Sequence, residues 1–151
     1  MRQIRITIGT LILAGTLEEA RAPKTCAAFV ALLPLRATLL QARWSGRSAY
    51  VPLEDVHIRL DPENDMHRPE PGQVLFYPEA ESPTEILMPY GTTVFAAICG
   101  PLSGNHFLTI PDADGLREIE RLVVWKGAQD ITFAIMPEAT DAVTVPGRGG
   151  S

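Results

Sequence analysis

The sequence has little positive charge and no long apolar run, which argues against two broad classes of function. Its 13 lysine and arginine residues are outnumbered by 18 aspartate and glutamate residues, which gives a formal net charge of −5. Proteins that bind nucleic acid gain affinity from clustered lysine and arginine at the phosphates, so we expect no nucleic-acid partner. No apolar stretch reaches the roughly 20 residues that span a bilayer, so we expect no membrane partner.

Cysteine is also scarce, and its spacing excludes the usual redox and metal frameworks. Cys26 and Cys99 form neither a CxxC pair nor a dense set. Two isolated thiols in a chain of this size are typical of a reducing compartment, so we predict a cytoplasmic protein without a disulfide. Cys26 falls on an apolar helical stripe and Cys99 in an apolar segment, and we expect both thiols to be inert in the core.

Motifs for metal, phosphate and serine-nucleophile chemistry are missing. His57 and His67 stand near the acids Asp61, Glu63 and Asp65, but no HxH, HExxH or EF-hand spacing occurs. There is no glycine-rich phosphate loop and no nucleophile elbow. We therefore predict no metal and no cofactor.

The N-terminal segment imitates a signal peptide, because Arg2 and Arg5 precede an apolar run that extends to Leu17. Polar residues interrupt this run, and Glu18 and Glu19 stand where a neutral cleavage region is expected. We predict two short strands around Gly9 instead.

What the sequence does contain is a mainly β pattern with two helices. Alternating apolar residues, such as Ile4, Ile6 and Ile8, predict strands with one buried face. The predicted strands cover residues 3–8, 11–17, 35–44, 48–53, 74–77, 86–90, 94–99, 105–110 and 131–135. Helical spacing predicts one helix from Pro23 to the stop at Pro34, and a second that Asp112 or Asp114 caps and that ends at Gly127.

These elements indicate one domain over residues 1–136. Residues 54–72 contain many polar residues and prolines, and we expect them to form a long surface loop. Residues 137–151, which end in Gly-Arg-Gly-Gly-Ser, are expected to be a loose tail.

Two motifs resemble the cyclophilin fold. Residues 22–29 (APKTCAAF) are similar to the segment that opens the first cyclophilin helix. Residues 100–107 (GPLSGNHF) resemble the stretch in which Gly-Ser-Gln-Phe-Phe lines the proline pocket of cyclophilins. With the order of the elements, the resemblance covers roughly residues 3–135 and implies a cyclophilin-like closed β-barrel.

The chain departs from cyclophilins at the residues that catalyse prolyl isomerisation. Cyclophilins carry a Phe-His-Arg segment, whose arginine polarises the substrate carbonyl, and a neighbouring Gln-Gly-Gly-Asp segment. This chain has WSGR at residues 44–47 and PGQVLFYP at 71–78 in their place. His106 stands where the pocket glutamine is expected and adds a group that titrates near neutrality. We expect no prolyl isomerase activity.

A closer resemblance is to a bacterial cyclophilin-like family of unknown function. The similarity lies in ARWSG at residues 42–46, in residues 71–78, in Tyr90-Gly91 and in residues 100–107. This resemblance implies a fold and a pocket, and it implies no reaction.

His106 is the first candidate for a catalytic residue. Gly104 gives the backbone before it conformational freedom, and Phe107 is expected to anchor the chain after it in the core. We expect its imidazole at the mouth of the barrel, with a hydrogen-bonded structural histidine as the alternative. The amide of Asn105 can orient a substrate carbonyl or serve a turn.

Arg43 and Trp44 form a second candidate pair. The guanidinium can clamp a carboxylate or an amide oxygen, and the indole can stack on a planar ligand. The alternatives are a solvated arginine and a core tryptophan. Tyr77 and Tyr90 can each present a phenol to the same cavity or pack in the core.

An acidic loop supplies the third candidate group, Glu79, Glu81 and Glu85. A carboxyl buried near His106 would have a raised pKa and could act as acid or base at neutral pH. The alternative is a solvated loop, and the sequence does not decide which glutamate faces the pocket.

These residues predict binding or turnover of a small polar metabolite in a barrel-mouth pocket, and whether the protein is an enzyme stays open. The catalytic candidates are His106, Glu81 and Glu85, and the binding candidates are Arg43, Trp44, Tyr77, Tyr90 and Asn105. Hydrolysis of a small amide is the reaction that this chemistry suggests first. The alternative is a non-catalytic ligand-sensing or partner-binding module, in which the same groups form an interface in a homo-oligomer.

Overall fold

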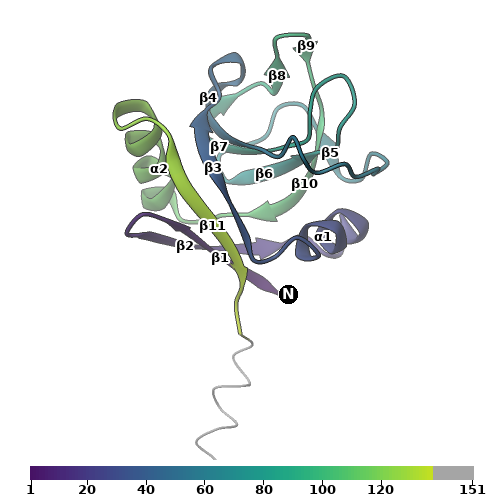
Figure 1. Ribbon diagram of the computed structural model, residues 1–151, viewed down its shortest axis with the longest axis horizontal. Coiled ribbons are helices and arrows are strands. Elements are labelled where there is room, and N and C mark those ends of the chain that lie inside the picture. The colour runs from purple at the N-terminus through teal and green to yellow at the C-terminus, as the bar shows by residue number, and fades with distance from the viewer. Residues whose placement is uncertain (138–151) are drawn as a thin grey trace, which may run out of the picture.

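Eight antiparallel strands close into a barrel in the computed structural model, which describes residues 1–137 (Figure 1). The strands follow the order β2-β1-β11-β3-β4-β7-β6-β10, and β10 pairs back with β2 to close the wall. Their bounds are Gln3–Ile8 (β1), Leu11–Leu17 (β2), Leu35–Gln41 (β3), Gly46–Pro52 (β4), Gln73–Tyr77 (β6), Glu85–Thr93 (β7), Gly104–Thr109 (β10) and Gln129–Ile135 (β11). The predicted mainly β fold with a closed barrel is confirmed.

The remaining elements lie outside the barrel wall. They are helices α1 (Pro23–Val30) and α2 (Ala113–Trp125), the short 3-10 helix η1 (Arg43–Ser45), and the two-residue strands β5 (Asp65–Met66), β8 (Ala96–Ala97) and β9 (Gly100–Pro101). No helix within residues 1–137 is both long and apolar enough to cross a bilayer. The predicted tail, residues 137–151, lies outside the described residues except for its first residue.

The barrel interior is filled by apolar side chains that alternate along the strands. Ile4, Ile6 and Ile8 are buried on β1, as their spacing predicts. Phe107 packs against Phe29 of α1, with ring centroids 4.8 Å apart. Because this core occupies the inside of the barrel, the space for a ligand is to be sought outside the wall.

A second, smaller core covers the outer face of strands β4, β7 and β6. On β7, Ile86 and Met88 belong to the interior core, so Leu87 between them faces outward. We call this second cluster the outer core, and its buried members are Ala42, Leu75, Tyr77, Leu87, Phe95 and Leu102. Segment 42–45 and the β8–β9 hairpin supply its cover.

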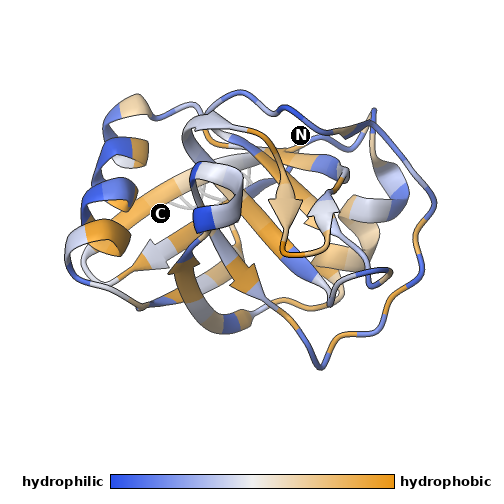
Figure 2. Cartoon of the chain, turned by 90° about the horizontal axis from the view of Figure 1, so that it is seen from above, coloured by the Kyte–Doolittle hydropathy of each residue, from blue (hydrophilic) through white to orange (hydrophobic). Residues whose placement is uncertain are grey.

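Helix α2 follows its sequence pattern closely. The Asp112 side chain accepts a hydrogen bond from the Gly115 amide at 2.9 Å, so Asp112 is the N-cap. Leu116, Ile119 and Val123 form the buried face. Figure 2 shows hydrophilic and hydrophobic residues alternating along this helix, at the left of the view.

Two predicted strands are wrong in the segments that leave the barrel wall and cover the outer core. The expected strand over 94–99 is wrong, because only Ala96 and Ala97 pair, and they pair with the hairpin partner β9. Cys99 therefore lies at an exposed turn, whereas Cys26 is buried, and burial raises the pKa of the Cys26 thiol to about 12. The expected strand over 35–44 ends at Gln41, and Trp44 in η1 is 62% exposed rather than in the core.

Candidate functional site

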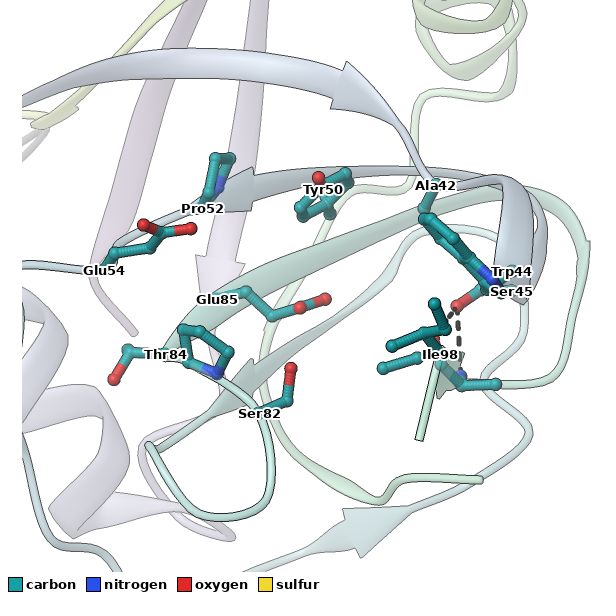
Figure 3. A pocket seen from close by; sticks show the side chains of 13 residues that line it. Ala42, Trp44, Ser45, Tyr50, Pro52, Glu54, Ser82, Thr84, Glu85 and Ile98 are labelled. Atoms are coloured by element: carbon teal, nitrogen blue, oxygen red, sulfur yellow. Dashed lines mark hydrogen bonds between the residues drawn. The ribbon is translucent and has the colours of Figure 1, made fainter. Parts of the chain in front are cut away.

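A pocket of about 200 Å³ lies on the outer face of the barrel wall, beside the outer core (Figure 3). Four segments line it: the strand β4 and its continuation, the loop that leads into β7, the η1 segment and the β8 turn. Its lining residues are Ala42, Trp44, Ser45, Tyr50, Pro52, Glu54, Ser82, Pro83, Thr84, Glu85, Ala96, Ala97 and Ile98. We call it the outer pocket; it does not lie at the barrel mouth, where we expected a pocket.

Glu85 is the central polar group of the outer pocket. As the first residue of β7 it pairs with Pro52 on β4 and with Tyr77 on β6, and the outward-facing Leu87 shares its face. Figure 3 shows its carboxyl group extending into the pocket. Burial raises the pKa of Glu85 to about 7, because the charged form loses solvation among apolar neighbours. This carboxyl group can therefore accept or release a proton near neutral pH.

Tyr50 shares the pocket with Glu85 and responds to the same surroundings. Burial raises the pKa of its phenol, and the negative charges of Glu85 and Glu54 raise it further. The phenol therefore stays protonated and can donate a hydrogen bond into the pocket.

The rim of the pocket is an exposed apolar pair held by a rigid backbone. Trp44 is 62% exposed and Ile98 is 85% exposed. Between them, the Ser45 hydroxyl donates to the Ala96 carbonyl at 3.0 Å and accepts from the Ala96 amide at 3.1 Å. These bonds join η1, which carries Trp44, to β8, which precedes Ile98, and they fix the backbone at this end of the pocket.

The opposite side is fixed by Thr84. Its hydroxyl donates to the Val56 carbonyl at 2.6 Å, and its own carbonyl accepts from the Leu53 amide at 2.9 Å. These bonds tie the loop before Glu85 to the chain that follows β4. The pocket thus has a preformed wall on both sides of the carboxyl group.

Of the eight residues that the sequence singled out, the structure brings Trp44 and Glu85 together in the outer pocket. The other six do not line it: Arg43, Tyr77, Glu81, Tyr90, Asn105 and His106. Arg43 and Glu81 are exposed, Tyr77 is buried in the outer core, and Tyr90 is buried in the interior core. Among the three acids of the loop, Glu85 faces the pocket, whereas Glu79 pairs with His57 at 2.6 Å.

His106 lies in a hydrogen-bond network of its own and is 7% exposed. Its Nε2 is 2.8 Å from the Thr109 hydroxyl, which donates to Glu18 at 2.6 Å, so Nε2 carries the proton. Its Nδ1 is 3.4 Å from the side-chain amide nitrogen of Asn64. Burial lowers the pKa of His106, and the Glu18 charge opposes this effect only in part.

One strand, β6, lies between His106 on β10 and the pocket residue Glu85 on β7. His106 pairs with Leu75 on β6, and Leu75 pairs with Leu87 on β7. Neighbouring strands lie about 4.8 Å apart, so the His106 backbone is roughly 10 Å from that of Leu87. His106 is not among the residues that line the outer pocket, and its imidazole is held by Thr109 and Asn64.

Asn105 joins the barrel to the long surface loop, residues 54–72. Its side-chain oxygen accepts from the Glu63 amide at 3.1 Å, and its nitrogen donates to the Thr25 hydroxyl at 3.0 Å and to the Asp61 carbonyl at 3.1 Å. Glu63 in turn accepts from Thr25 and Lys24 at the start of α1. Burial raises the pKa of Glu63, but these hydrogen bonds outweigh it and hold that pKa below its ordinary value.

The Asn105→Ala variant is expected to lose roughly 2–4 kcal/mol of unfolding free energy, because it leaves buried partners without hydrogen bonds. Urea denaturation measures this loss. The exposed Arg43→Ala variant is the control and is expected to stay within about 0.5 kcal/mol of the wild type. Equal stability of both variants would show that the network contributes nothing.

The outer pocket also contains residues that the sequence analysis missed, chiefly Tyr50, Glu54, Ser82 and Ile98. The sequence pattern could have predicted the position of Tyr50. The apolar Ala49 and Val51 on either side are buried in the barrel, so alternation places Tyr50 on the outer face of β4. No comparable signal existed for Ile98, since its position depends on the hairpin. Within residues 1–137, no group of three or more histidine, cysteine or acidic side chains is placed to hold a metal ion.

Comparison with known proteins gives one family and a set of similar folds. Residues 4–135 match the sequence model of a family described as "Protein of unknown function (DUF3830)". No curated protein matches the chain.

Two solved structures are similar in fold. The structure of McbB in complex with tryptophan has a TM-score of 0.70 and 21% identity, over 91% of this chain and 46% of McbB. The chain thus spans about half the length of McbB. The solution structure of the hypothetical protein AF2241 from Archaeoglobus fulgidus has a TM-score of 0.61 and 20% identity, over 88% of this chain and 93% of AF2241.

Proposed function

We propose that this chain, which belongs to the DUF3830 family, binds a small molecule in the outer pocket, with Glu85 as the polar anchor. One observation carries the proposal: the partly buried carboxyl group of Glu85, with a pKa of about 7, extends into a pocket whose walls are mostly apolar. Apolar walls with a few placed polar groups are the usual form of a ligand site. A volume of about 200 Å³ is below the range for drug-sized ligands, and it suits a small metabolite.

The similar fold of McbB supports the choice of probe. McbB has been solved in complex with tryptophan, a molecule with a planar apolar ring and a small polar end. A ligand of that shape can place its ring against Trp44 and Ile98 and its polar end towards Glu85. We also propose, from the motifs at residues 22–29 and 100–107, that the barrel is related to that of cyclophilins without their isomerase activity.

The test is calorimetric titration and thermal shift with tryptophan, small amides, ureas and carboxylates. We expect at least one compound to bind the wild type and to lose about tenfold or more in affinity in the Glu85→Gln variant, which keeps the size but removes the charge. Glu81→Gln is the matched control, because Glu81 lies in the same loop and does not line the pocket. Equal loss in both variants would contradict the assignment of Glu85.

Turnover is a second candidate function, and the pKa of Glu85 favours it. A carboxyl group with a pKa of about 7 can act as general base towards water at neutral pH, as hydrolysis of a small amide requires. Tyr50 can donate a hydrogen bond within the same pocket. If ammonia release from any bound amide is detected, Glu85→Gln is expected to reduce its rate about 100-fold or more, while His106→Ala retains it.

A further inference from the structure

The charges around the outer pocket point to the class of ligand. We propose that the pocket selects a molecule with a positive charge, such as a protonated amine on an apolar body, over neutral and anionic molecules of the same shape. This inference rests on the proposed binding function and specifies the chemistry of its ligand.

The charged residues that line the outer pocket are all acidic. The carboxylates are Glu54 and Glu85, and the lining contains no lysine, arginine or histidine. An anion in the pocket would meet two negative groups with no compensating charge, whereas a cation would be attracted by both.

Two basic side chains of the β4 region have partners outside the outer pocket, and the exposed Arg43, next to Trp44, does not line it. Arg47, on β4, binds Glu120 of α2, with its guanidinium nitrogen 2.7 Å from the carboxylate. His57, beyond Glu54 on the chain, binds Glu79. Among residues 1–137 no side chain forms an ion pair or hydrogen bond with the Glu85 carboxylate, so its acceptor oxygens are available for a ligand donor.

The rim of the pocket suits a cation with an apolar body. The Trp44 indole is exposed, and the hydrogen bonds between Ser45 and Ala96 hold its backbone. A tryptophan face attracts a cation through its quadrupole and equally packs against an apolar body. Ile98, at the same rim, adds only apolar contact, so the rim favours an amine with an apolar part over a small hydrated ion.

Proton release follows from this arrangement. Around Glu85 lie Tyr50 and Glu54 from β4 and its continuation, Tyr77 from β6, and Ser82 and Thr84 from its own loop. None of these supplies a positive charge, so a cationic ligand is the group that stabilises the ionised carboxylate. Binding near pH 7 then displaces a proton from Glu85, and affinity for a cation rises with pH.

The experiment uses probes that share a ring and differ in charge. Tryptamine is the cation, indole the neutral compound, tryptophan the zwitterion and indole-3-acetate the anion; benzylamine and benzoate form a second, smaller pair. Affinities of the full chain are measured by calorimetry at about pH 6 and about pH 8.5. We expect tryptamine to bind at least about tenfold more tightly than indole-3-acetate, with the preference greater at the higher pH.

The variants separate charge recognition from binding itself. Glu85→Gln is expected to lower the affinity for tryptamine about tenfold or more and to leave that for indole unchanged, and Glu81→Gln is expected to change neither. If the anions bind as tightly as the amines, the charge inference is overturned while the binding function stands. If none of the six compounds binds the wild type, the charge inference is overturned; if the small amides, ureas and other carboxylates also fail to bind, the proposed function is overturned as well.

Discussion

Gly72→Ala is expected to lower the free energy of unfolding by roughly 4 kcal/mol or more, the largest effect of any single methyl group that we foresee. Gly72 precedes β6 with a φ of +90°, and a Cβ atom there would lie 2.3 Å from the Ile110 carbonyl oxygen. Its amide also donates to the Pro89 carbonyl at 3.0 Å, and its carbonyl accepts from the Ile110 amide at 2.9 Å. The backbone therefore cannot move away from the clash without breaking bonds to β7 and the end of β10.

Gly127→Ala is the matched control for this effect. Gly127 has a φ of +91°, but a Cβ atom there would have no neighbour within 4 Å. This variant is expected to show only the strain of the left-handed backbone, about 1–2 kcal/mol. Urea denaturation followed by circular dichroism measures both; similar losses would show that the close approach at Gly72 is relieved by movement of the chain.

Glu85→Gln is expected to make the protein more stable at alkaline pH, by up to about 3 kcal/mol near pH 8.5. This free energy corresponds to the difference between a pKa of about 7 for Glu85 in the folded protein and 4.5 for an exposed glutamate. A neutral glutamine removes the cost of holding a charge in the pocket. A gain in stability together with a loss of ligand binding is the pattern expected of a site residue.

The pH dependence has a definite sign. Because the folded protein holds the Glu85 proton more tightly than the unfolded chain does, the stability of the wild type falls as pH rises from 4.5 through about 7. His106 acts in the opposite sense, since its lowered pKa makes stability rise as pH rises through the region just below 6.5. The difference between wild type and Glu85→Gln isolates the glutamate, because both contain His106.

The measurement is urea denaturation of both proteins at about pH 5 and about pH 8.5, with Glu81→Gln as control. We expect the variant and the wild type to differ little near pH 5 and to diverge at the higher pH. A constant difference at both values would mean that the Glu85 carboxyl group titrates normally.

Local patterns in the sequence predict most strands of the barrel wall and the second helix. The alternation of Ile4, Ile6 and Ile8 and the stripe on α2 are local patterns, and burial follows them wherever an element has one face on the core. The resemblance to a family of unknown function was likewise readable from short motifs and agrees with the family match.

The candidate site, in contrast, depends on contacts between distant segments. Glu85 lies in a pocket while Glu81 stays exposed, Trp44 and Ile98 meet at one rim, and His106 is enclosed by Thr109 and Asn64. The physical reason is that each of these outcomes depends on which strands become neighbours and on how segment 42–45 and the β8–β9 hairpin fold back over them. Contacts between segments that are far apart in the sequence produce no repeating pattern of residues. Alternation therefore predicts which face of the sheet a side chain occupies, but not which residues it contacts on that face.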